Sequence, residues 1–142
     1  MAQITATRCP AAALPEAEAD AWRAFANPLM GPDFARAVGR VREDAEVVTY
    51  RRSDEIVGFL GLHRRPGGFA RPLGVPFADY HALVTGPAPG FKGREALTLA
   101  GVRAFRHIGL IDPFGLFDSI AVGPTAFAIA LPEGPDAHLE AI

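Results

Sequence analysis

The stretch Glu55-Ile-Val-Gly-Phe-Leu-Gly-Leu-His63 decides the fold. It is an almost unbroken apolar run with β-branched and aromatic members, which predicts a strand covered on both faces. Gly58 and Gly61 lie inside the run, where a glycine permits close approach of a neighbouring backbone, helix or ligand. Residues 45–52 are predicted to form a second strand, and the short turn Ser53-Asp54 joins the two. The sequence therefore predicts an antiparallel hairpin.

Two helices are predicted before this hairpin. Residues 1–14, which precede them, are expected to be irregular or to hold a short strand at 3–7. Pro15 suits the first turn of the first helix. Trp22 and Phe25 share one face of it, and it ends at Asn27-Pro28 because proline disfavours helical backbone in the preceding residue. Pro32 starts the second helix. Its predicted buried stripe consists of Phe34, Val38 and Val41.

The segments after the hairpin predict a loop, a strand and a third helix. The Pro- and Gly-rich segment 64–76 is a connecting loop, since proline has no N–H to donate to a ladder. Residues 79–84 form a strand, and a helix follows in which Leu97 and Ile108 lie along one side and Gly109 is the stop. Two further strands are predicted at residues 114–122 and 126–131.

This order of elements predicts an α/β fold of the α+β kind, with a mixed, mostly antiparallel sheet flanked by helices. A chain of 142 residues is expected to form a single domain, residues 1–142. Only about a turn and a half of helix fits after Asp136, so we expect the chain to be the first part of a longer protein.

Composition excludes several classes of function. The net charge of −2 argues against a general nucleic-acid binder, and no run approaches the roughly 20 apolar residues of a membrane span. Cys9 is the only cysteine, so no intramolecular disulfide is possible and a reducing compartment is expected. With no signal peptide in the first residues, we expect a cytoplasmic protein.

The polar triplet Asp79-Tyr80-His81 is the predicted substrate-binding site. It opens a strand directly after a rigid loop. Asp79 and His81 share one face of that strand and can hold a substrate hydroxyl, whereas Tyr80 points to the other face unless a bulge intervenes. The structural alternatives are a capping role for Asp79 and a core position for Tyr80.

No metal site is predicted. His63 is at a strand end, His107 is near a helix end and His138 is close to the end of the sequence. Their spacing does not suggest that they converge, so each is interpreted as a surface or capping residue. Cys9 has no discernible activating partner.

Several short motifs point to a family. They are Trp22, Asn27-Pro28 with Asp33-Phe34, Ile56-Val57-Gly58-Phe59, Arg71-Pro72-Leu73-Gly74 leading to Asp79-Tyr80-His81, Phe117-Asp118, and Asp136-Ala137-His138-Leu139. Together with the order of elements, they resemble the N-terminal region of CelD/BcsL-type acyltransferases. These are two-domain members of the GNAT superfamily with a FemAB-like layout, linked to cellulose biosynthesis.

The resemblance implies transfer of an acyl group from acetyl-CoA or another acyl-CoA to an amine or hydroxyl of a sugar or polymer precursor. In this family the clearest acetyl-CoA site belongs to a second, C-terminal GNAT domain, which is missing from this chain. The present domain would contribute to binding a small-molecule or saccharide acceptor, and in isolation we expect little or no activity.

The resemblance also implies where a coenzyme would bind. GNAT enzymes hold the CoA pyrophosphate on backbone N–H groups where a strand meets a helix, usually with the pattern Gln/Arg-x-x-Gly-x-Gly/Ala. Residues 65–70 match by letter, but no helix is predicted to follow them. In the corresponding segment, 90–95, Lys92, Gly93 and Arg94 can attract an anion, but Glu95 would repel it. We therefore predict a degenerate loop and no bound coenzyme in this chain.

Two alternatives remain open. The chain can be a non-catalytic binding or dimerisation module that uses an exposed sheet edge, for example to form a homodimer. It can also be a complete single-domain acetyltransferase, which the damaged pyrophosphate motif disfavours.

Overall fold

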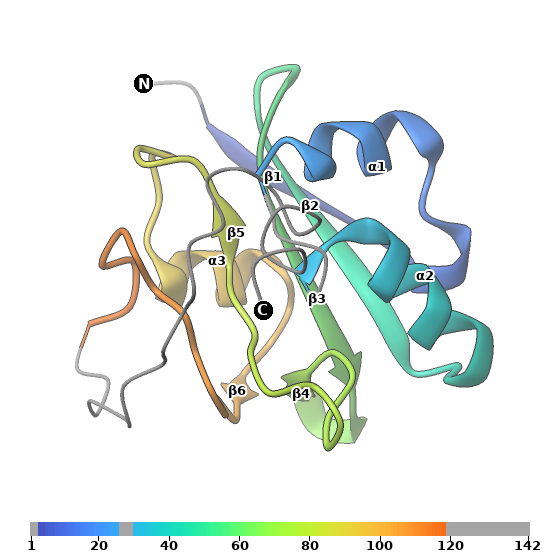
Figure 1. Ribbon diagram of the computed structural model, residues 1–142. Coiled ribbons are helices and arrows are strands. Elements are labelled where there is room, and N and C mark those ends of the chain that lie inside the picture. Colours follow the sequence, from blue (N-terminus) through green and yellow to red (C-terminus); the bar gives the residue numbers. More distant parts are fainter. Residues whose placement is uncertain (1–2, 26–29, 119–142) are drawn as a thin grey trace, which may run out of the picture.

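The computed structural model describes residues 3–25 and 30–118, which form one sheet with helices on both of its faces (Figure 1). The strands are β1 (Ile4–Pro10), β2 (Ala45–Arg52), β3 (Glu55–Arg64), β4 (Phe69–Pro72), β5 (Val84–Thr85) and β6 (Ala104–Phe105). The α-helices are α1 (Glu16–Arg23), α2 (Pro32–Val41) and α3 (Gly93–Leu99). Two single turns of 3-10 helix are η1 (Ala11–Ala13) and η3 (Pro66–Gly68).

The sheet is mixed. Its order is β1-β2-β3-β4-β6, and β5 pairs with β3 beside this path. Along the path from β1 to β4 each strand is antiparallel to the one before it, β5 is antiparallel to β3, and β6 is parallel to β4. The predicted α+β fold with a mostly antiparallel sheet is confirmed for the described residues.

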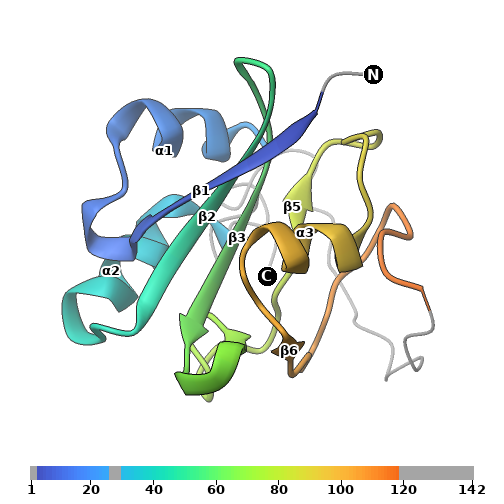
Figure 2. The same ribbon diagram turned by 180° about the vertical axis from the view of Figure 1, so that it is seen from behind.

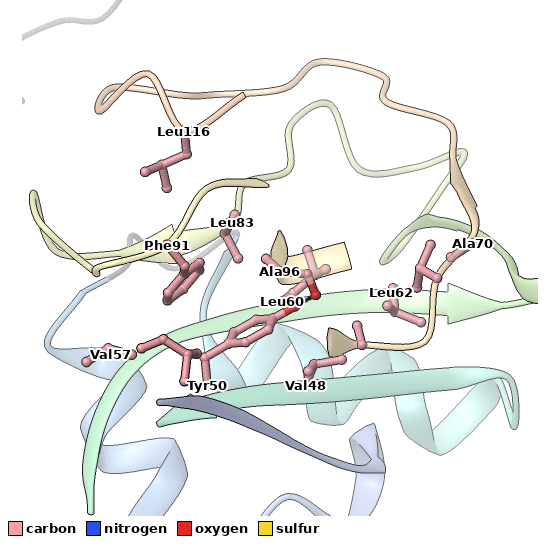
Figure 3. Packing of buried hydrophobic residues seen from close by; sticks show 13 residues of the cluster. Val48, Tyr50, Val57, Leu60, Leu62, Ala70, Leu83, Phe91, Ala96 and Leu116 are labelled. Carbon is pink, nitrogen blue, oxygen red and sulfur yellow. Dashed lines mark hydrogen bonds between the residues drawn. The ribbon is translucent and has the colours of Figure 1, made fainter. Parts of the chain in front are cut away.

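Both faces of β3 are covered, as predicted from its apolar run. On one face α1 and α2 pack against the α1/α2-side cluster, which includes Trp22, Ala35, Val47, Phe59 and Leu73. The other face is the one on which α3 lies (Figure 2). Here the α3-side cluster includes Tyr50, Leu60, Leu62, Phe91 and Ala96 (Figure 3). The strand β3 is therefore buried between the two clusters, at the centre of the fold.

A bulge in β3 affects which of the two clusters its side chains join. Tyr50 pairs with Gly58 and Arg51 pairs with Ile56, which leaves Val57 as an extra residue. Ile56 consequently packs with the α1/α2-side cluster, and its neighbour Val57 is buried in the α3-side cluster.

The two glycines of β3 lie where other segments approach closely, as the sequence predicts. A Cβ at Gly58 would lie 2.9 Å from the Val84 carbonyl oxygen and 2.7 Å from Thr85 Cγ2. A Cβ at Gly61 would lie 2.9 Å from Leu73 Cδ2. Larger side chains at these positions would push β5 and Leu73 away from the sheet.

The third helix is shorter than predicted. Gly101 has a φ of 68°, in the left-handed region, and it ends α3 in a Schellman motif. The Gly101 N–H donates to the Thr98 carbonyl at 2.9 Å, and the Val102 N–H donates to the Leu97 carbonyl at 2.8 Å. The chain then extends into β6, so the predicted continuation of the helix to Ile108 is wrong.

Other predicted boundaries also need correction. Of the predicted strand at 79–84, only Val84 belongs to a strand of the structure, β5. His81 makes an isolated bridge to Leu110 outside the named strands. Of the predicted buried stripe of α2, Phe34 and Val38 pack against the α1/α2-side cluster, as predicted. Val41 is 79% exposed, however, and the fully buried residue Ala35 was not predicted.

Toward the end of the described part, residues 114–118 form irregular structure with turns and bends, and not a strand. The first helix, α1, ends at Arg23, so the predicted end at Asn27-Pro28 is wrong. Residues 119–122, the strand predicted at 126–131 and the terminal segment with His138 lie outside the described residues.

Replacing Tyr50 with phenylalanine tests the link between β2 and α3. The buried Tyr50 hydroxyl donates to the Ala96 carbonyl at 3.0 Å. We expect the free energy of unfolding to fall by about 1 kcal/mol, the usual net value of such a bond, because that carbonyl keeps its helical partner, the Ala100 N–H. Urea unfolding measures the change. The same substitution at the exposed Tyr80 is the control and should change stability by less than about 0.5 kcal/mol.

Candidate functional site

The predicted triplet Asp79-Tyr80-His81 lies in an irregular segment between β4 and β5. The His81 N–H donates to the Gly109 carbonyl at 3.1 Å, and the His81 carbonyl accepts from the Ile111 N–H at 2.9 Å. Gly109 has a φ of 63°, and a Cβ there would lie 2.1 Å from the Asp79 carbonyl oxygen. Only glycine permits this close approach, so the position of the triplet depends on residue 109.

The three residues of the triplet do not share the predicted strand geometry. Asp79 and Tyr80 are exposed, with Tyr80 at 37%, whereas His81 is buried at 6%. The shared face expected for Asp79 and His81 is therefore not formed. Of the three, His81 alone is a buried polar group.

His81 belongs to a histidine–aromatic cluster made of His81, Phe105, His107 and Phe117. The ring nitrogens His81 Nε2 and His107 Nδ1 are 3.3 Å apart, within hydrogen-bond distance. Phe105 lies against both histidines, with ring centroids 5.5 Å from His81 and 4.8 Å from His107, and Phe117 meets His107 edge-on at 4.7 Å. The interpretation of His107 as a surface or capping residue is wrong, because the chain turns into β6 and carries His107 back to His81.

The two imidazoles are held in the neutral form. Burial, with a smaller effect of His107, lowers the pKa of His81 to about 3. Burial also lowers the pKa of His107, and the nearby Asp112 partly opposes this. A neutral pair shares one N–H between Nε2 and Nδ1. His81 Nδ1 is buried and has no hydrogen-bond partner among the described residues.

A small cavity lies beside His81, between the helices α1 and α2 and strand β3. It measures about 20 Å³, and its lining includes Trp22, Phe34, Leu73, Tyr80, His81 and Val84. A cavity of that size holds a single water-sized group. The indole Nε1 of Trp22 is also buried without a hydrogen-bond partner among the described residues.

The predicted anion site at Lys92, Gly93 and Arg94 is occupied by the chain itself. Lys92 Nζ donates to the Gly115 carbonyl at 2.9 Å, and the Gly93 N–H donates to the Leu116 carbonyl at 2.8 Å. The Phe117 ring lies so close to Gly93 that a Cβ there would be 2.4 Å from it. The turn that does this, residues 112–117, thus closes the amino end of α3.

Asp112 fixes this turn. Its two carboxylate oxygens accept the N–H groups of Leu116 and Phe117, each at 2.9 Å. Arg94 remains exposed and, with Arg103 and Asp118, lines an open hollow of about 390 Å³.

His63 is buried and hydrogen-bonds to two other segments of the chain, so it is not the predicted surface residue. It is 2% exposed, its Nε2 accepts the Gly74 N–H at 3.0 Å, and its Nδ1–H donates to Asp44 at 3.1 Å. Burial lowers the pKa of His63 in spite of Asp44. The signal was in the sequence, because His63 is in phase with Phe59 and Gly61 on one face of β3. Both ring nitrogens serve the fold, so His63 is not a candidate ligand.

The remaining groups to consider are possible metal ligands and the Cys9 thiol. Among the described residues, no group of three or more His, Cys, Asp and Glu side chains is arranged to hold a metal ion. Burial, together with Glu18 and Glu46, raises the pKa of the Cys9 thiol, which keeps it protonated at neutral pH.

No helix in the described part of the chain has the length and apolar character needed to cross a membrane. Comparison of the chain with protein-family models, with curated proteins and with solved structures finds no match.

Proposed function

We propose that this chain is a GNAT-like N-terminal domain of a CelD/BcsL-type acyltransferase, and that it binds the acceptor of the acyl group rather than the acyl-CoA. The order of its elements supports the proposal. Two helices separate β1 from the antiparallel strands β2 to β4, and the crossover helix α3 then leads to β6, parallel to β4. This is the mixed sheet with a strand-to-helix junction that the resemblance implies.

The occupied amino end of α3 is the observation that supports binding of the acceptor, rather than of the acyl-CoA, by this domain. A CoA pyrophosphate needs free N–H donors at such a junction. Here Lys92 and Gly93 donate to the turn at residues 112–117. Under this proposal the acetyl-CoA or other acyl-CoA is bound by the second GNAT domain of the complete protein.

The acceptor surface proposed for this domain is the segment Asp79-Tyr80-His81. Tyr80 exposes part of its ring next to the small cavity, which suits packing against the apolar face of a sugar. Asp79 offers an exposed carboxylate for hydroxyl groups, and His81 lines the cavity beside them. A sugar or polymer precursor is the acceptor class that these groups fit.

Calorimetric titration with acetyl-CoA tests the proposal. We expect no saturable heat up to about 1 mM coenzyme, because donors already engaged within the chain do not compensate the desolvation of a pyrophosphate. A parallel titration of the ¹⁵N-labelled chain with cellotetraose is expected to shift the backbone amide resonances of residues 79–81. Micromolar binding of acetyl-CoA that is lost in Lys92→Ala would overturn the proposal.

A non-catalytic dimerisation module is the second candidate, and the position of β1 favours it. In the described part of the chain, β1 pairs with β2 alone and is a strand at the edge of the sheet. An open edge can add a strand from another molecule. Sedimentation velocity separates the two candidates, since a dimer that persists at micromolar concentration favours assembly and a monomer argues against it.

A further inference from the structure

The open hollow beside α3 has no part in the proposed acceptor site, with which it shares no residue. Its volume of about 390 Å³ lies in the range of small-molecule pockets. Three segments form its wall: one side of α3, the two residues 102–103 that follow the end of that helix, and residues 116–118. The hollow is therefore large enough for a ligand of several heavy atoms.

Hydrogen bonds within the chain hold all three segments of this wall. The Schellman motif at Gly101 fixes the path of the chain as it leaves α3, and the Arg103 N–H donates to the Gly68 carbonyl at 2.8 Å. Asp112 holds the turn that leads to residues 116–118. The hollow is thus largely preformed, which reduces the entropy lost when a ligand binds.

Two arginines without an acidic partner line the hollow. Arg94 belongs to the first turn of α3 and Arg103 follows that helix, and both are exposed. Neither guanidinium group forms an ion pair within residues 3–25 and 30–118, whereas Arg23 on α1 pairs with three carboxylates. The stem of Arg103 lies against Gly68, where an added Cβ would be 2.9 Å from Arg103 Cγ. Because the guanidinium fork matches the two oxygens of a carboxylate, this part of the wall suits an anion.

Much of the remaining wall is apolar. The apolar residues that line the hollow are Leu97, Val102, Leu116 and Phe117. Leu97 and Phe117 are only partly buried, so a ligand can cover apolar surface that is now in contact with water. Removing such surface from water is favourable in proportion to its area. A ligand that fills the hollow therefore needs an apolar body as well as an anionic group.

We propose that this hollow binds a small carboxylic acid with an apolar body, of the class of a medium-chain fatty acid. Arg94 and Arg103 hold the carboxylate, and the hydrocarbon part lies against the apolar wall. The inference is independent of the function proposed for residues 79–81.

Asp118 and the apolar wall favour a single negative charge on the ligand. Asp118 also lines the hollow, so an anion there meets one repulsive carboxylate besides the two arginines. The cost of removing an ion from water rises with the square of its charge, whereas its attraction to the arginines rises only in proportion to the charge. A carboxylate is therefore favoured over a phosphate dianion.

Titration of the ¹⁵N-labelled full chain with sodium octanoate tests the proposal. We expect saturable shifts of the backbone amide resonances of residues 97–98, 102–103 and 116–118. Octan-1-ol, which has the same hydrocarbon chain without the charge, should bind at least about tenfold more weakly, the effect of losing a charge-assisted hydrogen bond. Equal binding of the alcohol, or shifts confined to other residues, would overturn the proposal. Tighter binding of octyl phosphate than of octanoate would overturn the choice of a carboxylate.

Four single substitutions at exposed positions show whether the residues of the hollow act as proposed. Arg94→Gln and Arg103→Gln should each weaken octanoate binding by about tenfold. Asp118→Asn should tighten it by about twofold, because it removes the repulsive charge. Arg40→Gln is the matched control, since it removes an exposed arginine from α2, on the other face of the sheet (Figure 2), and it should change the affinity by less than about twofold. An equal loss of affinity in Arg40→Gln and Arg103→Gln would mean that net charge alone governs binding, and the site would be wrong.

Discussion

Replacing Phe59 with alanine is expected to lower the free energy of unfolding by about 3–5 kcal/mol. Phe59 is fully buried at the centre of the α1/α2-side cluster. Its ring stacks on Trp22 and also meets Phe25, at a centroid distance of 6.4 Å. Removing it loses the buried apolar surface and the aromatic contacts, and leaves a cavity that α1 cannot fill without moving.

Urea unfolding followed by circular dichroism measures this loss. The matched control is Phe77→Ala, since Phe77 is 93% exposed in the turn after β4. That substitution should change stability by less than about 0.5 kcal/mol. Similar effects at both positions would show that α1 does not pack on β3 as described.

Acidification from pH 7 to pH 5 is expected to cost about 2 kcal/mol of stability through His81 alone. A histidine in the unfolded chain has its ordinary pKa of 6.5, whereas burial lowers the pKa of folded His81 to about 3. Between these values the unfolded chain binds a proton that the folded chain excludes. Stability therefore falls as the pH falls below 6.5, and the contribution of His81 levels off near pH 3.

Comparison with His81→Asn isolates this contribution. His63 and His107 also have lowered pKa values, so the wild-type chain loses further stability in the same range. Urea midpoints at pH 7 and pH 5 should therefore differ less in the variant than in the wild type. An NMR titration of the His81 ring measures its pKa directly and applies even if the variant is unstable. A folded-state pKa near 6.5 would contradict the burial of His81.

The hairpin and the type of sheet were predictable because their signals are local. The run from Glu55 to His63 carries its own two-face pattern, and Ser53-Asp54 provides the turn, where Ser53 adopts a φ of 54°. Pro32 marked the start of α2 correctly. The close contacts at Gly58 and Gly61 followed from the rule that glycine in a strand marks close approach.

The histidine–aromatic cluster was not predictable because it depends on where a helix stops. The helical spacing of apolar residues continues past Gly101, and only the left-handed conformation of that glycine ends α3. Because the helix was predicted to continue past Gly101, the return of the chain toward His81 was not predicted. With His107 assigned to a helix end, no pattern along the sequence related residues 81 and 107, which meet through tertiary contacts alone.

Opening the amino end of α3 to a bound anion would require two segments to change together. Substitution of Glu95 would remove a repulsive charge, yet Lys92 and Gly93 would remain engaged with the carbonyls of Gly115 and Leu116. Releasing those carbonyls means dismantling a turn that Asp112 holds from within. No single substitution therefore frees this helix end, and a feature that depends on two segments in this way changes only when both are altered together.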